Sequence, residues 1–117
     1  MKLPNCLEAV VPDNKVQNYL LNLFHKTGKT KAIFLMKFGF TIEDFFILKD
    51  ELKLLACESE IINEVDGEFG KKYTVIGRLK SPDGRNPEMI SVWQFDNLFG
   101  IFSKIPKFVT TYPTKNR

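Results

Sequence analysis

The residues of this chain with the clearest chemical potential lie in one short polar segment. The only histidine, His25, is followed by Lys26, Lys29 and Lys31. Imidazole ionises near neutral pH and can take up and return a proton, while lysine ammonium groups neutralise an anion. Together these side chains could act on a phosphate ester without a metal ion.

The same segment contains Gly28-Lys29-Thr30, which matches the end of a phosphate-binding P-loop. A P-loop also needs a glycine five residues before Gly28, where Leu23 stands, and a preceding strand, where the pattern is helical. The single histidine and the scattered carboxylates show no metal-ligand spacing. We therefore expect neither nucleotide hydrolysis nor a metal ion, and no cofactor.

A catalytic histidine needs partners that His25 lacks nearby, and two hydroxyls near the end of the chain are candidates. Thr110 and Tyr112 alternate within an expected strand at about 107–112, so their side chains share one face. We expect the His25 imidazole to lie across a groove from these hydroxyls. Threonine and tyrosine are also ordinary strand formers, so a purely structural role fits the pattern as well.

Three helices are expected to position the histidine. Apolar spacing predicts them at about 12–23, 28–38 and 41–57. Gly39 can take the left-handed conformation that ends the second helix. Thr41 opens the third helix in a variant of the capping box. The apolar residues at helical spacing in the first and third helices are Val16, Tyr19, Leu20, Leu23, Ile42, Phe45, Leu48, Leu52 and Leu55.

After Cys57 the hydrophobic pattern alternates, which indicates strands. They are expected at about 59–65, 71–80, 89–96 and 107–112. Turn signals separate the first three strands, at Asp66-Gly67 and at Ser81-Pro82-Asp83-Gly84-Arg85. Consecutive strands joined by short turns form an antiparallel meander.

These elements predict a single α+β domain over residues 1–117, with a helical half at about 1–57 and a sheet half at about 58–113. The three N-terminal helices would pack on one face of a four-stranded antiparallel sheet. The other face is left for water or for a partner.

Several residues of the sheet half could contact RNA. Lys72 and Arg78 share one face of the second strand, Arg85 lies in the turn that follows, and Trp93 lies on the third strand. Cations contact phosphates and a tryptophan can stack on a base, so we predict these four residues, together with Lys29, as substrate-binding. The alternatives are a solvated sheet face, a solvated turn and a core tryptophan.

The composition sets modest limits on function. A net charge of +3 permits a polyanionic partner without requiring one. Cys6 and Cys57 lie far apart and match neither a disulfide framework nor a zinc site, so we expect free thiols in a reducing cytosol. The start of the chain lacks the apolar region of a signal peptide, and no apolar run could cross a bilayer. We expect a soluble cytoplasmic protein with no membrane partner.

Short segments spread over nearly the whole chain resemble a bacterial domain family of unknown function. They are Lys2-Leu3-Pro4-Asn5, Tyr19-Leu20-Leu21, His25 with Gly28-Lys29 and Lys31-Ala32, Phe38-Gly39-Phe40, Pro82-Asp83-Gly84-Arg85, Val92-Trp93, and Val109-Thr110-Thr111-Tyr112-Pro113. More distantly, the order of helices and antiparallel sheet, with an early histidine and a late Thr-x-Tyr, resembles the barnase, EndoU, colicin and RelE superfamily of metal-independent toxin ribonucleases.

This distant resemblance implies a site and an activity. It makes His25 the proton-transfer residue, Lys29 or Lys31 the cation on the phosphate, and Thr110 and Tyr112 the hydroxyls of the last strand. A lysine here replaces the arginine of many such toxins, which removes a bidentate phosphate contact. The implied activity is cleavage of RNA through a 2′,3′-cyclic phosphate by the toxin of a bacterial toxin–antitoxin or toxin–immunity pair.

A toxin of this kind needs a neutralising partner, an antitoxin or an immunity protein. The apolar segment Leu98-Phe99-Gly100-Ile101-Phe102 could bind it, or could instead fold back over the edge of the core. Two other functions stay open. One is a non-catalytic RNA- or protein-binding module, antitoxin-like or adaptor-like, whose RNA binding would fall steeply with salt. The other is a structural interaction domain.

Overall fold

Helical segments occupy the first half of the chain in the computed structural model, which describes residues 1–114. They are η1 (Cys6–Glu8), α1 (Asp13–Lys15), η2 (Val16–Leu20), α2 (Lys29–Lys37) and α3 (Phe45–Glu58). The short helix α1 runs directly into η2, which is one π-helical turn. The three predicted helices are therefore present, and each is shorter than the apolar pattern suggested.

The helices begin and end at the following residues. The first stops at Leu20, and Leu23 is 40% exposed beyond it. Gly39 adopts a φ of 101° just after α2, as predicted, and its N–H is bonded to the Met36 carbonyl. The Thr41 hydroxyl accepts the Asp44 N–H at 3.2 Å ahead of α3, which is the threonine half of the predicted cap.

The second half of the chain forms one antiparallel sheet. Its strands are β1 (Glu60–Gly67), β2 (Gly70–Arg78), β3 (Glu88–Leu98), β4 (Ile101–Phe102) and β5 (Lys107–Pro113). β1, β2 and β3 pair in chain order, while β4 and β5 both pair with the remaining edge of β3. The four predicted strands are confirmed. The apolar segment at the end of β3 is not a loop. It forms a hairpin in which a two-residue turn joins β3 to β4.

The alternation predicted for the strands separates a core face from an outer face. On β2, Tyr73 and Val75 are buried while Lys72 and Thr74 are more exposed. The buried strand residues belong to the same hydrophobic cluster as Leu48, Leu52 and Leu55 of α3. Burying one such leucine contributes about 1.5–3 kcal/mol. The α+β class is therefore confirmed, while the packing of all three helices on one face stays a prediction.

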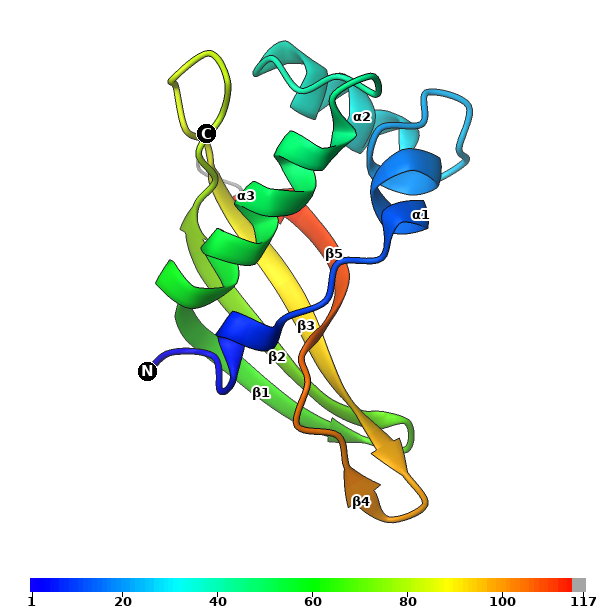
Figure 1. Cartoon of the computed structure of the whole chain (residues 1–117), viewed down its shortest axis with the longest axis vertical. Coiled ribbons are helices and arrows are strands. Elements are labelled where there is room, and N and C mark those ends of the chain that lie inside the picture. The colour runs from blue at the N-terminus through cyan, green and yellow to red at the C-terminus, as the bar shows by residue number, and fades with distance from the viewer. Residues whose placement is uncertain (115–117) are drawn as a thin grey trace.

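The molecule is elongated, with extents of 41 × 28 × 24 Å. α1 and α2 gather at the upper end in Figure 1, where β5 finishes, and α3 crosses in front of the sheet. The β3–β4 hairpin points away at the lower end. The segments expected to carry the site, at about residue 25 and residue 112, thus lie at the same end of the molecule.

The two cysteines are not free thiols. Cys6 and Cys57 form a disulfide with Cα atoms 5.1 Å apart, which ties η1 to the last turn of α3. Our prediction was wrong because separation along the sequence says nothing about separation in space once the chain has folded. Disulfides persist in oxidising compartments.

Candidate functional site

Tyr19 joins the helical half of the chain to the last strand. Its hydroxyl is 2.9 Å from the Thr110 hydroxyl on β5, in a hydrogen bond that either can donate. One turn earlier, the Lys15 ammonium donates to the Val109 carbonyl at 3.2 Å. The pairing of β3 with β5 shifts register beside Val92, where Val109 is the extra residue. Side chains from α1 and η2 therefore hold this part of β5, while the backbone of Val10 bridges to its first residue, Lys107.

Lys31 lies between two tyrosine rings. Its Nζ is 5.9 Å from the ring centroid of Tyr19 and 5.8 Å from that of Tyr112. Both distances fit cation–π attraction. Throughout residues 1–114, no carboxylate lies within ion-pairing distance of Lys31. Within the described residues its positive charge is therefore not balanced by a carboxylate.

His25 packs against the same tyrosine, with the ring centroids of His25 and Tyr19 5.1 Å apart. Its Nδ1 accepts the backbone N–H groups of Thr27 at 3.1 Å and Gly28 at 2.9 Å. A backbone N–H can only donate, so Nδ1 carries the lone pair and the neutral ring carries its proton on Nε2. In this conformation His25 caps the turn that leads into α2, and Nε2 is a donor.

Gly28 has a structural explanation that replaces its P-loop resemblance. A Cβ atom at this position would lie 2.2 Å from the Tyr19 carbonyl oxygen. The backbone at Gly28 therefore passes too close to η2 for any side chain. This close approach brings the start of α2, and with it Lys31, beside Tyr19.

These contacts define what we call the α2–β5 cluster, made of Tyr19, His25, Lys31, Thr110 and Tyr112. A cleft of about 290 Å³ opens beside it, lined by Thr30, Lys31, Phe34, Tyr112 and Pro113. The cluster offers one cation, three hydroxyls and an imidazole N–H. One of the Tyr19 and Thr110 hydroxyls donates to the other, and the second keeps its proton for an anion. The Lys31 ammonium, the Tyr112 hydroxyl and the imidazole N–H can donate as well. In the described part of the chain, no hydrogen bond or ion pair joins any of these groups to a carboxylate. Such a set is suited to binding a phosphodiester.

Four predicted catalytic residues are therefore close to one another. His25 and Thr110 do not touch directly, because Tyr19 stands between them and contacts both. From its spacing, Tyr19 was predicted only as an apolar position of the first helix. No local signal marks its contact with Thr110, because the two residues are 91 positions apart in the chain.

The predicted substrate-binding residues differ in their surroundings. Lys29 is exposed at the first position of α2. Lys72 pairs across the sheet with Gln94, and Arg78 donates to the Asn86 carbonyl at 3.0 Å. Neither residue has a contact with the cluster among the described residues. Arg85 donates to the Lys37 carbonyl at 2.6 Å, which ties its turn to the end of α2.

Trp93 does not offer a stacking surface. It is 0% exposed, and its indole N–H donates to the Ser91 hydroxyl at 3.0 Å. β3 is flanked by β2 and β5, and this position of its alternation faces the core. The alternative of a core tryptophan is the correct one.

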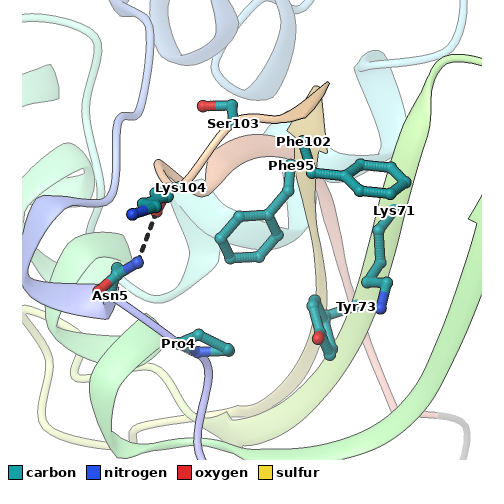
Figure 2. Close-up of a pocket in the computed structure, with 8 residues that line it drawn as sticks. All are labelled: Pro4, Asn5, Lys71, Tyr73, Phe95, Phe102, Ser103 and Lys104. Atoms are coloured by element: carbon teal, nitrogen blue, oxygen red, sulfur yellow. Dashed lines mark hydrogen bonds between the residues drawn. The ribbon is translucent and has the colours of Figure 1, made fainter. Parts of the chain in front are cut away.

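A second concavity lies between the start of the chain and the lower half of the sheet (Figure 2). Its volume is about 250 Å³, and it is lined by Pro4, Asn5, Lys71, Tyr73, Phe95, Phe102, Ser103 and Lys104. The rings of Tyr73 and Phe95 meet edge to face at 5.4 Å. Lys71 at its rim is paired with Glu64 at 2.9 Å. This aromatic hollow suits an apolar side chain better than a phosphate.

The carboxylates with lowered pKa values lie outside the α2–β5 cluster. Hydrogen bonds from Lys2 and the N-terminal amine lower the pKa of Glu60 to about 2. The Arg85 backbone N–H lowers the pKa of Asp83, and the Gln94 side chain lowers that of Asp96. These groups stabilise turns and chain ends rather than a reacting centre.

Within residues 1–114, no group of three or more histidine, cysteine, aspartate or glutamate side chains is arranged to hold a metal ion. In the same range no helix is long and apolar enough to cross a membrane.

Comparison with known proteins identifies a family and no individual relative. The chain belongs to the family described as domain of unknown function (DUF6883), whose pattern matches residues 2–115. No curated protein and no solved structure matches the chain. The predicted membership of a family of unknown function is thus confirmed, while the distant ribonuclease resemblance stays a hypothesis.

Proposed function

We propose that the protein is a metal-independent ribonuclease of the bacterial toxin type, which cleaves RNA at the α2–β5 cluster. The observation that carries the proposal is the contact between Tyr19 and Thr110, with Lys31 between Tyr19 and Tyr112. It gathers three hydroxyls and a cation that has no carboxylate partner within residues 1–114, and Lys31 and Tyr112 of this set line an open cleft. RNA supplies its own nucleophile, the 2′-hydroxyl, so no metal ion is required.

In this proposal each cluster residue has a distinct task. Lys31 neutralises the extra charge on the phosphorane, an effect for which removal of one donor costs about 10²–10³ in rate. The Tyr112 hydroxyl protonates the leaving 5′ oxygen. Tyr19 and Thr110 share one hydrogen bond, and the hydroxyl of the pair that accepts in it donates its own proton to the phosphate and orients it.

His25 would take the 2′-hydroxyl proton at Nε2, which first requires the other tautomer. Moving the ring proton to Nδ1 gives up the two bonds from Thr27 and Gly28. Leaving such donors without a partner costs about 1–3 kcal/mol, so the competent tautomer is roughly 5- to 150-fold less populated. That cost slows a base without preventing its action.

The test is cleavage of a single-stranded RNA in the presence of a chelator, read as fragments with 2′,3′-cyclic phosphate ends. Lys31→Met keeps the length of the side chain and removes the charge, and we expect it to lower cleavage about 10²–10³-fold. Lys53→Met, on the exposed side of α3, is the matched control and should stay within twofold of wild type. Equal cleavage by the two variants would refute the proposal.

We further propose a toxin–immunity pair over a toxin–antitoxin pair. RNA lies in the cytoplasm, whereas the Cys6–Cys57 disulfide is of a kind that forms in oxidising compartments. A toxin that forms its disulfide during export and then cleaves RNA in the cytoplasm of a neighbouring cell accounts for both the disulfide and the location of the substrate.

The β3–β4 hairpin is the surface we propose for the immunity protein. Phe99 is 105% exposed at its turn and has a φ of 56°, a left-handed conformation that is unfavourable for a bulky residue. Leu98 and Ile101 beside it are 54% and 73% exposed. The aromatic hollow of Figure 2 shares Phe102 with this hairpin and could receive a side chain of the partner. Phe99→Ser should weaken neutralisation and leave RNA cleavage unchanged.

One observation favours a second candidate, a non-catalytic RNA-binding module. The Nδ1 atom of His25 serves as a cap, and the same cluster could hold a phosphodiester without cleaving it. This function predicts salt-dependent RNA binding with no cyclic phosphate product. The chelator assay above separates it from the ribonuclease.

A further inference from the structure

Two neighbouring aromatic rings on one side of α2 and its C-cap are flanked by two cations, Lys31 and Arg85. The rings of Phe34 and Phe38 lie one helical turn apart, with centroids 4.9 Å from each other. The Arg85 guanidinium lies 4.4 Å above the centre of the Phe38 ring. Side chains from the helix and from the turn after β2 thus form one row of contacts, in which the two half-buried phenylalanine rings are tilted by 48° and also pack against the hydrophobic core.

The other end of this row reaches the α2–β5 cluster. Lys31 precedes Phe34 by three residues, and both line the 290 Å³ cleft with Tyr112. Tyr112 is 38% exposed, and Lys31 lies 5.8 Å from its ring. Two aromatic side chains and a cation therefore border one open space at the start of the row.

The charges along this side of α2 favour an anion. Lys31 has no carboxylate partner in the described chain. Arg85 uses Nε for Asp83 and one terminal nitrogen for the Lys37 carbonyl, which leaves its second terminal nitrogen available. Rings that can stack on bases, next to cations that can hold phosphates, are the combination that proteins use for single-stranded nucleic acids.

We infer that this row of side chains, Lys31, Phe34, Phe38, Arg85 and Tyr112, binds single-stranded RNA and guides it into the α2–β5 cluster; we call it the α2 track. The inference rests on the proposed function for the identity of the ligand. One base stacks in the cleft between Phe34 and Tyr112, and the next bases follow toward Arg85. Seven residues of helix separate Lys31 from Phe38, about 10 Å. That distance matches about three stacked nucleotides at 3.4 Å each.

The track requires unpaired bases, because a duplex hides base faces within its own stack. It therefore assigns the substrate class as single-stranded RNA of at least three nucleotides. It also gives Arg85, held in its turn by Asp83, the task of contacting the strand at the end away from the cleavage point.

The experiment measures binding apart from cleavage. A fluorescent 2′-O-methyl hexanucleotide has no free 2′-hydroxyl and cannot be cut, so fluorescence anisotropy reports binding alone. We expect wild type to bind the single strand at least tenfold more tightly than the same strand in a duplex. Phe34→Leu keeps apolar packing and removes the ring, and should weaken binding about 5- to 150-fold, from roughly 1–3 kcal/mol per stacked base. Phe69→Leu, an exposed ring in the β1–β2 turn, is the matched control.

The outcomes separate this inference from the proposed function. No binding by wild type, equal binding of duplex and single strand, or equal effects of Phe34→Leu and Phe69→Leu would each overturn the track, whatever the cleavage assay shows. Tight, Phe34-dependent binding supports it. If wild type binds in this way but leaves an unmodified RNA uncut, the track stands and the ribonuclease fails.

Discussion

His25 has two separable roles, and two substitutions distinguish them. The Oδ1 atom of an asparagine takes the place of the histidine Nδ1, so His25→Asn keeps an acceptor for the Thr27 and Gly28 N–H groups. The Nε2 atom of a glutamine takes the place of the histidine Nε2, so His25→Gln keeps a donor there and loses the cap. Neither side chain can take up a proton as imidazole does.

The stability effect follows from the two hydrogen bonds at Nδ1. Removing a cap of this kind costs about 1 kcal/mol. That should lower the melting temperature of His25→Gln and His25→Ala by about 4 °C in a domain of this size. His25→Asn should melt within about 1 °C of wild type, since asparagine and aspartate are good caps. Thermal unfolding followed by circular dichroism measures both shifts.

The activity effect is expected to differ in pattern. Loss of a general base lowers the rate about 10²–10⁴-fold, so all three variants should lose cleavage to that extent, including the thermally stable His25→Asn. If His25→Asn cleaves RNA at the wild-type rate, the histidine is only a cap and its catalytic assignment is wrong. If His25→Asn instead melts as early as His25→Ala, the assignment of Nδ1 as the capping acceptor is wrong.

Three further predictions concern the scaffold. The disulfide closes a loop with a sequence separation of 51, so replacing Cys6 and Cys57 by serine should lower the free energy of unfolding by about 4 kcal/mol in urea titrations; an unchanged midpoint would contradict the pairing. The pKa of Glu60 is lowered to about 2 by Lys2, so its contribution is complete above pH 4.5 and is lost as the pH falls toward 2. Glu60→Gln should therefore flatten stability between pH 5 and 2, and a curve parallel to wild type would argue against this pair. Gly28→Ala should destabilise the fold by about 1–3 kcal/mol through overlap with the Tyr19 carbonyl, despite the better helix propensity of alanine, and a gain in stability would disprove the close approach.

Sequence patterns predicted the parts of this fold that depend on local periodicity. The alternation along β2 correctly separated buried Val75 from exposed Lys72, and Gly39 ends α2 in the conformation that its position suggested. Hydrophobic burial decides the alternation and leaves its period in the chain, while the end of α2 follows from the freedom of glycine, which has no Cβ atom, to adopt a positive φ. Trp93 was misassigned because a large aromatic residue in a strand has the same pattern whether it meets the core or a ligand.

The features that were not predicted from the sequence arise from contacts between segments that are distant in the chain. The partnership of Tyr19 with Thr110, the disulfide and the need for a glycine at position 28 each depend on where two chain segments meet. β4 was missed because two apolar residues after a glycine carry too little periodicity to indicate a strand. The candidate site could be predicted by residue type, while its geometry and the capping role of His25 could not.

The central claim is that the α2–β5 cluster cleaves RNA without a metal ion. Its most direct test is the rate at which purified wild type and Lys31→Met convert a single-stranded RNA to fragments with 2′,3′-cyclic phosphate ends in the presence of a chelator. The account predicts cleavage by wild type and a rate about 10²–10³-fold lower for Lys31→Met, with Lys53→Met unaffected. Intact RNA with the wild-type protein, or equal cleavage by both lysine variants, would contradict it.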